Sequence, residues 1–90
     1  MVLSGRLLAI AKMVSKTDTV ADVGCDHGKL AVWLVQNGHA RQVICGDISE
    51  KSLDKARRLA AAEGLSDRIV TRVGDGLTIL TKGEVDTAVI

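Results

Sequence analysis

The segment from Thr19 to Gly28 reads TVADVGCDHG and joins an apolar run to two glycines, two aspartates, a cysteine and a histidine. An apolar run that ends in glycine and is followed by a helical pattern indicates a strand, a tight turn and a helix. Backbone amides and polar side chains of such a turn can surround a small polar ligand. The candidate binding residues of this turn are Asp22, Gly24, Cys25, Asp26 and His27. Asp22 has an alternative role as an acceptor for amides of the turn.

Asp47 ends a second apolar run, about 20 residues after the turn, the spacing at which an acidic side chain reaches a ribose bound over that turn. One carboxylate can accept from both ribose hydroxyls. The alternative is that Asp47, together with Ser49, caps the helix that follows. The nearby glycine turn favours ligand contact.

The turn departs from the dinucleotide fingerprint G-x-G-x-x-G, because Asp26 and Lys29 stand where a match that begins at Gly24 needs glycines. A carboxylate at Asp26 would repel a pyrophosphate placed at the start of the helix. S-adenosylmethionine has no phosphate and carries an ammonium, a carboxylate and a sulfonium. Asp22 and Asp26 suit its positive groups, while free amides of the turn would hold its carboxylate. The sequence therefore favours this cofactor over NAD.

Asp75 follows a third apolar run, in the sequence VGDGL. A carboxylate at that place can accept from the amino group of an adenine, with Gly76 beside it and with Ile48 and Leu77 as apolar walls for the ring. The alternative is an ordinary Asp-Gly turn, which this dipeptide favours by itself.

A metal site is a further possibility, because adjacent parallel strands could bring two pairs of ligands together. The residues concerned are Cys25, His27, Cys45 and Asp47. Alternation along a strand and through a turn points such side chains in different directions, so we interpret the cysteines as small buried residues and expect no metal. His27 is better interpreted as a polar loop residue near the methionine part of a ligand than as a general base, and no catalytic residue is assigned.

These motifs need elements that place them together. Apolar spacing predicts helices at Leu3–Val14 (capped by Ser4), Leu30–Gly38 and Ser49–Glu63, and a short helical stretch at Leu77–Leu80. Strands are predicted at Thr19–Val23, Gln42–Asp47, Arg68–Val73 and Val85–Ile90. Strands separated by helices must be parallel, so we expect an α/β fold with a doubly wound parallel sheet. Its ligand crevice would lie at the carboxyl ends of the strands, where all three motifs fall.

Composition narrows the class of protein. The 12 basic and 11 acidic residues nearly cancel, so the chain lacks the strong positive field of nucleic-acid binders. Trp33 is its single aromatic residue, which argues against a base-stacking platform. The two cysteines form neither a C-x-x-C motif nor a disulfide framework, and no membrane span or export signal is evident. We expect a reduced, soluble, cytoplasmic protein that does not contact membranes.

The sequence stops at Ile90 inside a predicted strand, which would leave the sheet with a bare edge. We therefore expect residues 1–90 to be the amino-terminal, cofactor-binding part of a larger domain. A homodimer that pairs through this edge strand is a second possibility.

At these motifs the chain resembles the class I S-adenosylmethionine-dependent methyltransferases, and more closely the bacterial tRNA (adenine(22)-N1)-methyltransferase family. The resemblance covers essentially the whole chain and is carried by Leu3–Leu7, Ala21–His27, Leu34–Gly38 and Arg72–Leu77. Cys25 stands where the family has serine, and Asp47 stands where it often has glutamate.

The resemblance implies a Rossmann-like domain of seven strands, of which about four are present here in the order three, two, one, four. It implies S-adenosyl-L-methionine as cofactor. Asp22, Gly24 and His27 would line its methionine end, Asp47 and Ile48 its ribose and adenine, and Asp75 and Gly76 the adenine edge.

The same resemblance implies tRNA modification, by methyl transfer to a ring nitrogen of adenine 22. Parts beyond residue 90 would grip the tRNA, so this part alone would be inactive. Two alternatives stay open, an NAD-binding half-domain of an oxidoreductase and a non-catalytic dimerising fragment.

Overall fold

The computed structural model describes residues 3–81 and 83–90, apart from the side chains of Asp26 and Leu77. Its elements in chain order are α1 (Gly5–Met13), β1 (Thr17–Val23), the 3-10 turn η1 (Asp26–Gly28), α2 (Lys29–Gln36), β2 (Ala40–Asp47), α3 (Glu50–Ala62), β3 (Ile69–Val73), the 3-10 turn η2 (Gly76–Ile79) and β4 (Thr87–Val89). Each predicted helix and strand is present, and the predicted caps Ser4 and Ser49 accept from amides in the first turns of α1 and α3.

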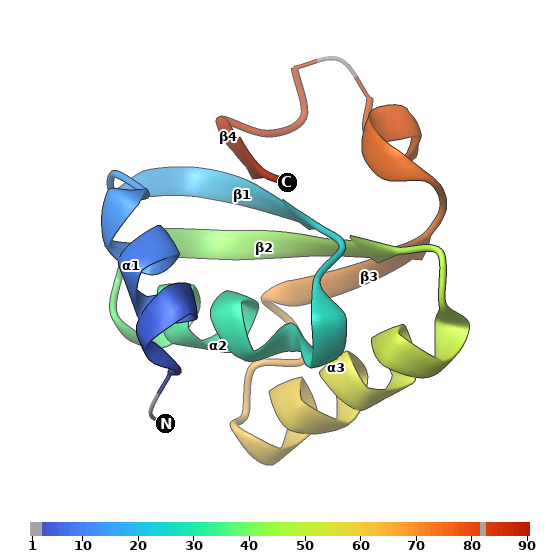
Figure 1. Ribbon diagram of the computed structural model, residues 1–90, viewed down its shortest axis with the longest axis horizontal. Coiled ribbons are helices and arrows are strands. Elements are labelled where there is room, and N and C mark those ends of the chain that lie inside the picture. Colours follow the sequence, from blue (N-terminus) through green and yellow to red (C-terminus); the bar gives the residue numbers. More distant parts are fainter. Residues whose placement is uncertain (1–2, 82) are drawn as a thin grey trace.

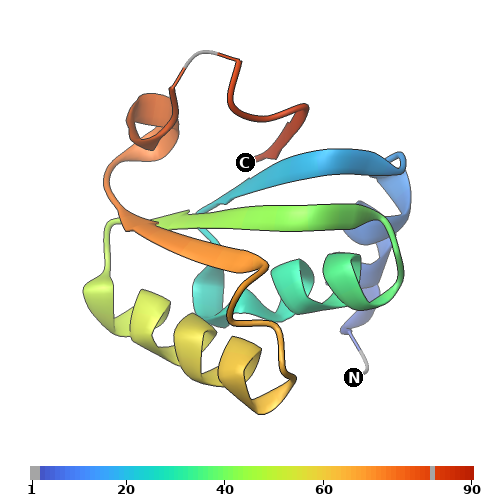
Figure 2. The ribbon, with the colours of Figure 1, turned by 180° about the vertical axis from the view of Figure 1, so that it is seen from behind.

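The strands form one parallel sheet in the order β3-β2-β1-β4, as the family resemblance implied. In Figure 1, α2 and α3 lie below the strands, and α1 lies at the left beside α2, in front of one end of β2; the three helices cover one face of the sheet (Figure 2). The α/β, Rossmann-like prediction is confirmed. In the described part of the chain η2 lies over the other face (Figures 1 and 2), where a doubly wound sheet carries its second layer of helices.

The hydrophobic core lies between the sheet and these helices. Leu34 of α2 and Leu53 of α3 are fully buried against Val20 and Val43 of the strands. Burial of each such side chain contributes about 1.5–3 kcal/mol. This layer fixes the helices under the sheet, and with them the loops that enter and leave each strand.

Gly28 allows the first turn to press against α3. The residue caps the amino end of α2 with a φ of 76°, a left-handed conformation that glycine adopts readily. A Cβ at this position would lie 2.8 Å from Cβ and 3.0 Å from Cα of Ala56. The absent side chain therefore lets η1 and α3 touch.

The last strand is shorter than predicted, because Asp86 replaces part of the strand ladder with its side chain. The backbone amide of Asp86 donates to the Thr19 carbonyl at 2.9 Å, while Asp86 Oδ2 accepts from the Thr19 amide at 3.0 Å. Regular pairing then begins at Thr87, beside Val20. Two further strands, β1 and β2, begin two residues earlier than predicted.

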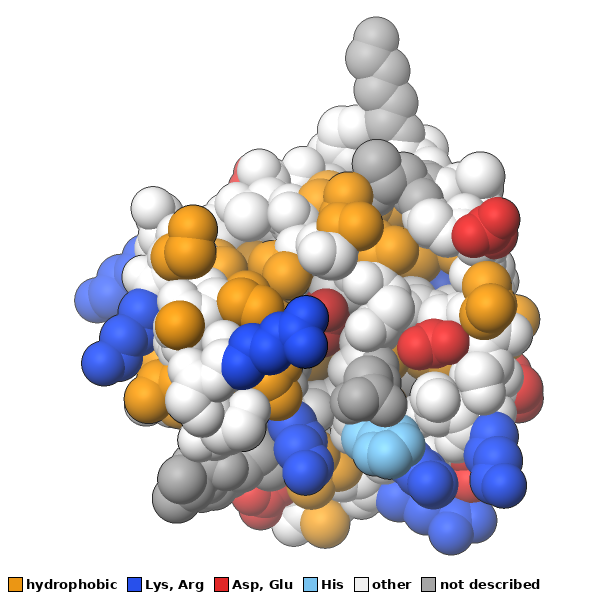
Figure 3. Space-filling model, viewed as in Figure 1, with side chains coloured by type: hydrophobic (Ala, Val, Ile, Leu, Met, Phe, Trp, Pro, Cys, Tyr) orange, Lys and Arg blue, Asp and Glu red, His pale blue; other side chains and the backbone are white. Residues whose placement is uncertain are grey.

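Two observations describe the surface. Among residues 3–81 and 83–90, none of the helices has the length and apolar character that a membrane span requires. On the face seen in Figure 3, the Lys and Arg side chains stand in separate groups with apolar side chains between them. This face does not offer the continuous basic stripe that binds a nucleic-acid backbone.

Candidate functional site

Backbone hydrogen bonds join the three predicted turns at the carboxyl ends of the strands. The Gly46 carbonyl accepts from the amides of Gly24 and Cys25, at 2.8 and 3.1 Å. The Asp47 carbonyl accepts from the Gly74 amide at 3.0 Å. The end of β2 thus holds the turn after β1 on one side and the turn after β3 on the other.

A pocket of about 410 Å³ opens beside the first turn. It is lined by Ser4, Arg6, Leu7, Ile10, Asp22, Val23, Gly24, Cys25, Leu30, Val89 and Ile90. Its volume lies within the range of about 300–1,000 Å³ that is typical of small-molecule sites. The pocket contains three of the predicted site residues, and its other walls come from α1, the ends of β1 and β4, and Leu30 of α2.

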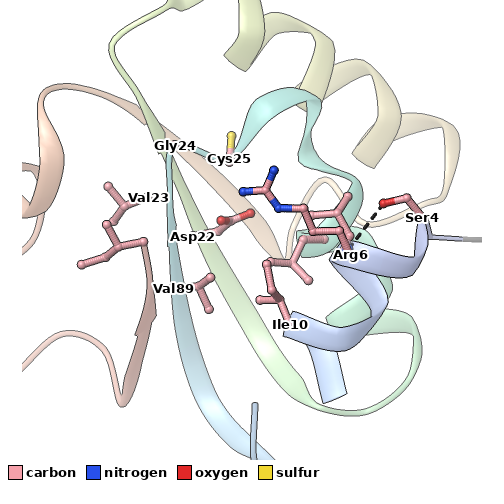
Figure 4. A pocket seen from close by; sticks show the side chains of 11 residues that line it. Ser4, Arg6, Ile10, Asp22, Val23, Gly24, Cys25 and Val89 are labelled. Atoms are coloured by element: carbon pink, nitrogen blue, oxygen red, sulfur yellow. Dashed lines mark hydrogen bonds between the residues drawn. The ribbon is translucent and has the colours of Figure 1, made fainter. Parts of the chain in front are cut away.

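Opposite charges face each other across this pocket. Asp22 on β1 is 4% exposed, and the Arg6 side chain reaches from α1 toward it and toward the Gly24–Cys25 turn (Figure 4). Arg6 is not among the site residues predicted from the sequence. Arg6 falls within the Leu3–Leu7 segment of the resemblance, but the folding of α1 back to the end of β1 is a tertiary feature that apolar spacing does not reveal.

The amides of the turn are less available than predicted. Those of Gly24 and Cys25 donate to Gly46, and that of Gly28 donates to the Cys25 carbonyl at 3.2 Å. A carboxylate bound at this end could not use these three amides without breaking their bonds. Arg6 is the cation among the lining residues and can supply a planar fork of N–H groups.

His27 has an unusual backbone, with φ 66° and ψ 0°. Few residues other than glycine adopt this region, although histidine is among those that tolerate it, and such strain is common at binding sites. In the described part of the chain His27 is not among the residues that line the pocket. The side chain of Asp26 lies outside the described residues, so repulsion of a pyrophosphate by its carboxylate stays a prediction.

Asp47 is half-buried, and its carboxylate already makes one contact. Oδ1 accepts from the Ser49 amide at 2.9 Å, and Ser49 Oγ accepts from the Ser52 amide at 3.2 Å. The capping role that the sequence left open is thus present. A carboxylate has about four acceptor sites, so capping does not prevent it from also accepting from two hydroxyls.

The turn after β3 presents Asp75 at the surface, where it is exposed. Its carbonyl accepts from the Thr78 amide at 3.3 Å and from Thr78 Oγ1, and Gly76 follows with a φ of 57°. Ile48, at the end of the neighbouring strand, is 73% exposed although it is apolar. The side chain of Leu77, the other predicted wall, lies outside the described residues.

Arg72 and Glu84 anchor the chain on either side of η2. Arg72 donates from Nη1 and Nη2 to the two carboxylate oxygens of Glu84, at 2.5 and 2.6 Å. Arg72 Nη1 also donates to the Ile79 carbonyl at 3.0 Å. Glu84 in turn accepts from the Thr81 amide at 3.0 Å. We call this set of contacts the η2 anchor.

The η2 anchor should make stability depend on acidity. Hydrogen bonds from Arg72, and then from the Thr81 amide, lower the pKa of Glu84 from 4.5 to about 2. A lowered pKa stabilises the fold above the unfolded value, and this contribution is lost as the pH falls from about 4.5 to about 2. We expect Glu84→Gln to melt below the wild type at pH 7, and this difference to close near pH 2, in thermal melts followed by circular dichroism.

The exposed Glu63, which accepts from Gln36 Nε2 at 3.2 Å, supplies a control. A difference between Glu84→Gln and wild type that stayed constant over this range, or that was no larger at pH 7 than the difference for Glu63→Gln, would contradict the linkage.

Cys25 and Cys45 are both buried, at 5% and 0% exposure, as predicted. A hydrogen bond with the Cys25 side chain, and then burial, raise the pKa of the Cys45 thiol. Within the described ranges, no group of three or more His, Cys, Asp or Glu residues is arranged to hold a metal ion.

Comparison with known proteins identifies the family of this chain. The family model described as "Methyltransferase domain" matches residues 3–90. The tRNA (adenine(22)-N(1))-methyltransferase of Bacillus subtilis (strain 168) is 36% identical over 88 residues. That match covers 98% of this chain and 37% of the relative.

Solved structures give the same picture. The crystal structure of the B. subtilis M1A22 tRNA methyltransferase TrmK has a TM-score of 0.90 and 36% identity, over 97% of this chain and 37% of that one. M. capricolum TrmK in complex with S-adenosyl-homocysteine has a TM-score of 0.87 and 33% identity, over 94% of this chain and 38% of that one. The chain therefore spans less than half the length of these proteins.

Proposed function

Because this chain belongs to the methyltransferase domain family, we propose that it is the S-adenosyl-L-methionine-binding part of a tRNA (adenine-N1) methyltransferase. The observation that carries the proposal is the pocket at the end of β1, in which Arg6 and Asp22 face each other. The similarity to TrmK, and the S-adenosyl-homocysteine in the M. capricolum protein, support the same cofactor and the same substrate class.

The charges of the pocket suit the amino-acid end of the cofactor. That end is a zwitterion, with an ammonium and a carboxylate on one carbon. Asp22 would hold the ammonium, while Arg6 would bind the carboxylate through paired N–H donors. Gly24 and Cys25 would form the floor, and His27 would flank the methionine end from the turn.

The adenosine end would cross the sheet toward β2 and β3. Asp47 would accept from the ribose hydroxyls, with Ile48 against the adenine ring. Asp75 and Gly76 would meet the edge of the adenine. The backbone bonds of Gly46 and Asp47 to the two flanking turns support this path, because they keep both halves of the site at one edge of the sheet.

When bound, the cofactor supplies an activated methyl group on a sulfonium for in-line attack by the adenine ring nitrogen. The residues of this chain would orient the cofactor and exclude water from one side of it. They would therefore contribute to catalysis by aligning the methyl group with the attacking nitrogen. The target base and the grip on tRNA would involve the part of a complete enzyme that this chain does not span. Residues 1–90 would then be the amino-terminal part of a larger domain, with little activity alone.

Calorimetry with S-adenosylhomocysteine and with NAD, titrated in parallel into this chain, tests the cofactor. We expect heat of binding with S-adenosylhomocysteine and none with NAD. Binding of NAD alone would replace the proposal with the dinucleotide alternative, and binding of neither would favour the non-catalytic fragment.

The assembly and location of the protein stay predictions. β4 lies at the edge of the sheet, which is where a second copy could add a strand. Light scattering on the calorimetry sample would give its mass. The cytoplasmic location rests on the class of reaction, which acts on tRNA.

A further inference from the structure

We infer that Arg72 and Glu84 are positioning residues for recognition of the adenine. This role rests on the proposed function and adds to it the residues that orient Asp75. The η2 anchor joins β3 to the chain before β4, so that the segment containing the Asp75–Gly76 turn is held at both ends. These two side chains would act through that turn. Asp75 itself would contact the base.

The anchor seats η2 in a close-fitting cradle. Ile79 packs on two glycines, since a Cβ at Gly46 would lie 2.0 Å from Ile79 Cδ1 and a Cβ at Gly74 would lie 2.2 Å from Ile79 Cγ2. The Ile79 carbonyl is held at the same time by Arg72, whose backbone lies beside Gly46 in the sheet. The far end of η2 is thus fixed by shape and by a charged hydrogen bond.

The near end of η2 is fixed at the same edge of the sheet. The Gly74 amide donates to the Asp47 carbonyl, and Thr78 donates from both its amide and its hydroxyl to the Asp75 carbonyl. Asp75 therefore lies between two held points that are a few residues apart. Loosening the far point should let the Asp75 carboxylate move relative to Asp47, because fewer contacts would then hold this turn against β2.

Arg72 and Glu84 are well placed for such a role. Their side chains are 33% and 26% exposed, which is much less than the 63% and 61% of Arg41 and Asp18. The latter pair is also held by two hydrogen bonds, at 2.7 and 3.1 Å, but lies near the amino ends of β2 and β1. The Arg72–Glu84 pair thus lies beside the candidate site, and the Arg41–Asp18 pair, at the amino ends of the strands, can serve as its control.

The experiment compares S-adenosylhomocysteine with S-inosylhomocysteine, in which a carbonyl replaces the amino group of the adenine. The wild-type chain is expected to prefer the adenine ligand by about tenfold, the worth of one charged hydrogen bond. Arg72→Ala should weaken binding of the adenine ligand by about tenfold and leave the hypoxanthine ligand nearly unchanged, so that the preference disappears. Arg72→Lys, which keeps the charge but loses the fork, should fall between the two.

Arg41→Ala is the control and should leave both dissociation constants unchanged. If Arg72→Ala does not fold, judged by circular dichroism, Glu84→Gln and Arg72→Lys decide by the same ratio. A folded variant of Arg72 or Glu84 that keeps the full preference for adenine would overturn the inference. Failure of the wild-type chain to bind S-adenosylhomocysteine would instead overturn the proposed function.

Discussion

Replacing Asp47 by alanine is expected to weaken binding of both S-adenosylhomocysteine and adenosine by about a hundredfold. The reason is the loss of two charge-assisted hydrogen bonds to the ribose, together worth about 3 kcal/mol. Titration calorimetry with each ligand measures the effect. Both ligands contain the ribose, so their affinities should fall by the same factor.

Two further variants sharpen this result. Asp47→Asn keeps an oxygen for the Ser49 amide, so it separates ligand binding from the cap of α3. Arg6→Ala should weaken binding of S-adenosylhomocysteine by about tenfold and leave binding of adenosine unchanged, because adenosine lacks the carboxylate. Asp67, which is exposed and precedes the amino end of β3, away from the candidate site, serves as the neutral control. Unchanged affinity in both folded Asp47 variants would remove Asp47 from the site.

Gly28→Ala is expected to destabilise the fold by about 3 kcal/mol or more. A left-handed backbone costs an L residue about 1–2 kcal/mol, and overpacking a core adds about 1–3 kcal/mol. The new Cβ would meet Cβ and Cα of Ala56 at 2.8 and 3.0 Å, and the backbone atom cannot turn aside. In a chain of this size the melting temperature should fall by roughly 10–20 °C.

Gly38→Ala is the matched control for this prediction. Gly38 has a φ of 73°, close to the 76° of Gly28, but a Cβ there would meet nothing within 4 Å. Its cost should be the backbone part alone, about 1–2 kcal/mol. Equal melting temperatures for the two variants would show that contact with Ala56 carries no energetic weight.

The order and type of the elements could be predicted from the sequence because each signal is local. Ser49 caps α3 as its residue type suggests, and Gly38 and Gly64 have the positive φ expected after a helix. The extent of β4 could not be predicted. Its start depends on the Asp86 carboxylate reaching the Thr19 amide, a contact between residues far apart in sequence.

The site divides in the same way. Chain topology places Asp22, Asp47 and Asp75 at neighbouring strand ends, so alternation of strands and helices was enough to group them. Arg6 could not be found by that rule, because it precedes the first strand and joins the pocket only through the packing of α1. The sequence also could not predict that the amides of Gly24 and Cys25 donate to the Gly46 carbonyl, because this contact between neighbouring strands depends on the fold and not on residue type.

The buried pair of thiols has a consequence for labelling chemistry. Thiolates react with alkylating reagents, whereas Cys45 is fully enclosed and its raised pKa keeps it protonated. Modification of Cys45 thus requires the segment around the first turn to open, at a rate set by that local opening. The rate of alkylation of the two native cysteines would therefore measure how often this segment opens, with no engineered label. A ligand that stabilises the turn should lower that rate.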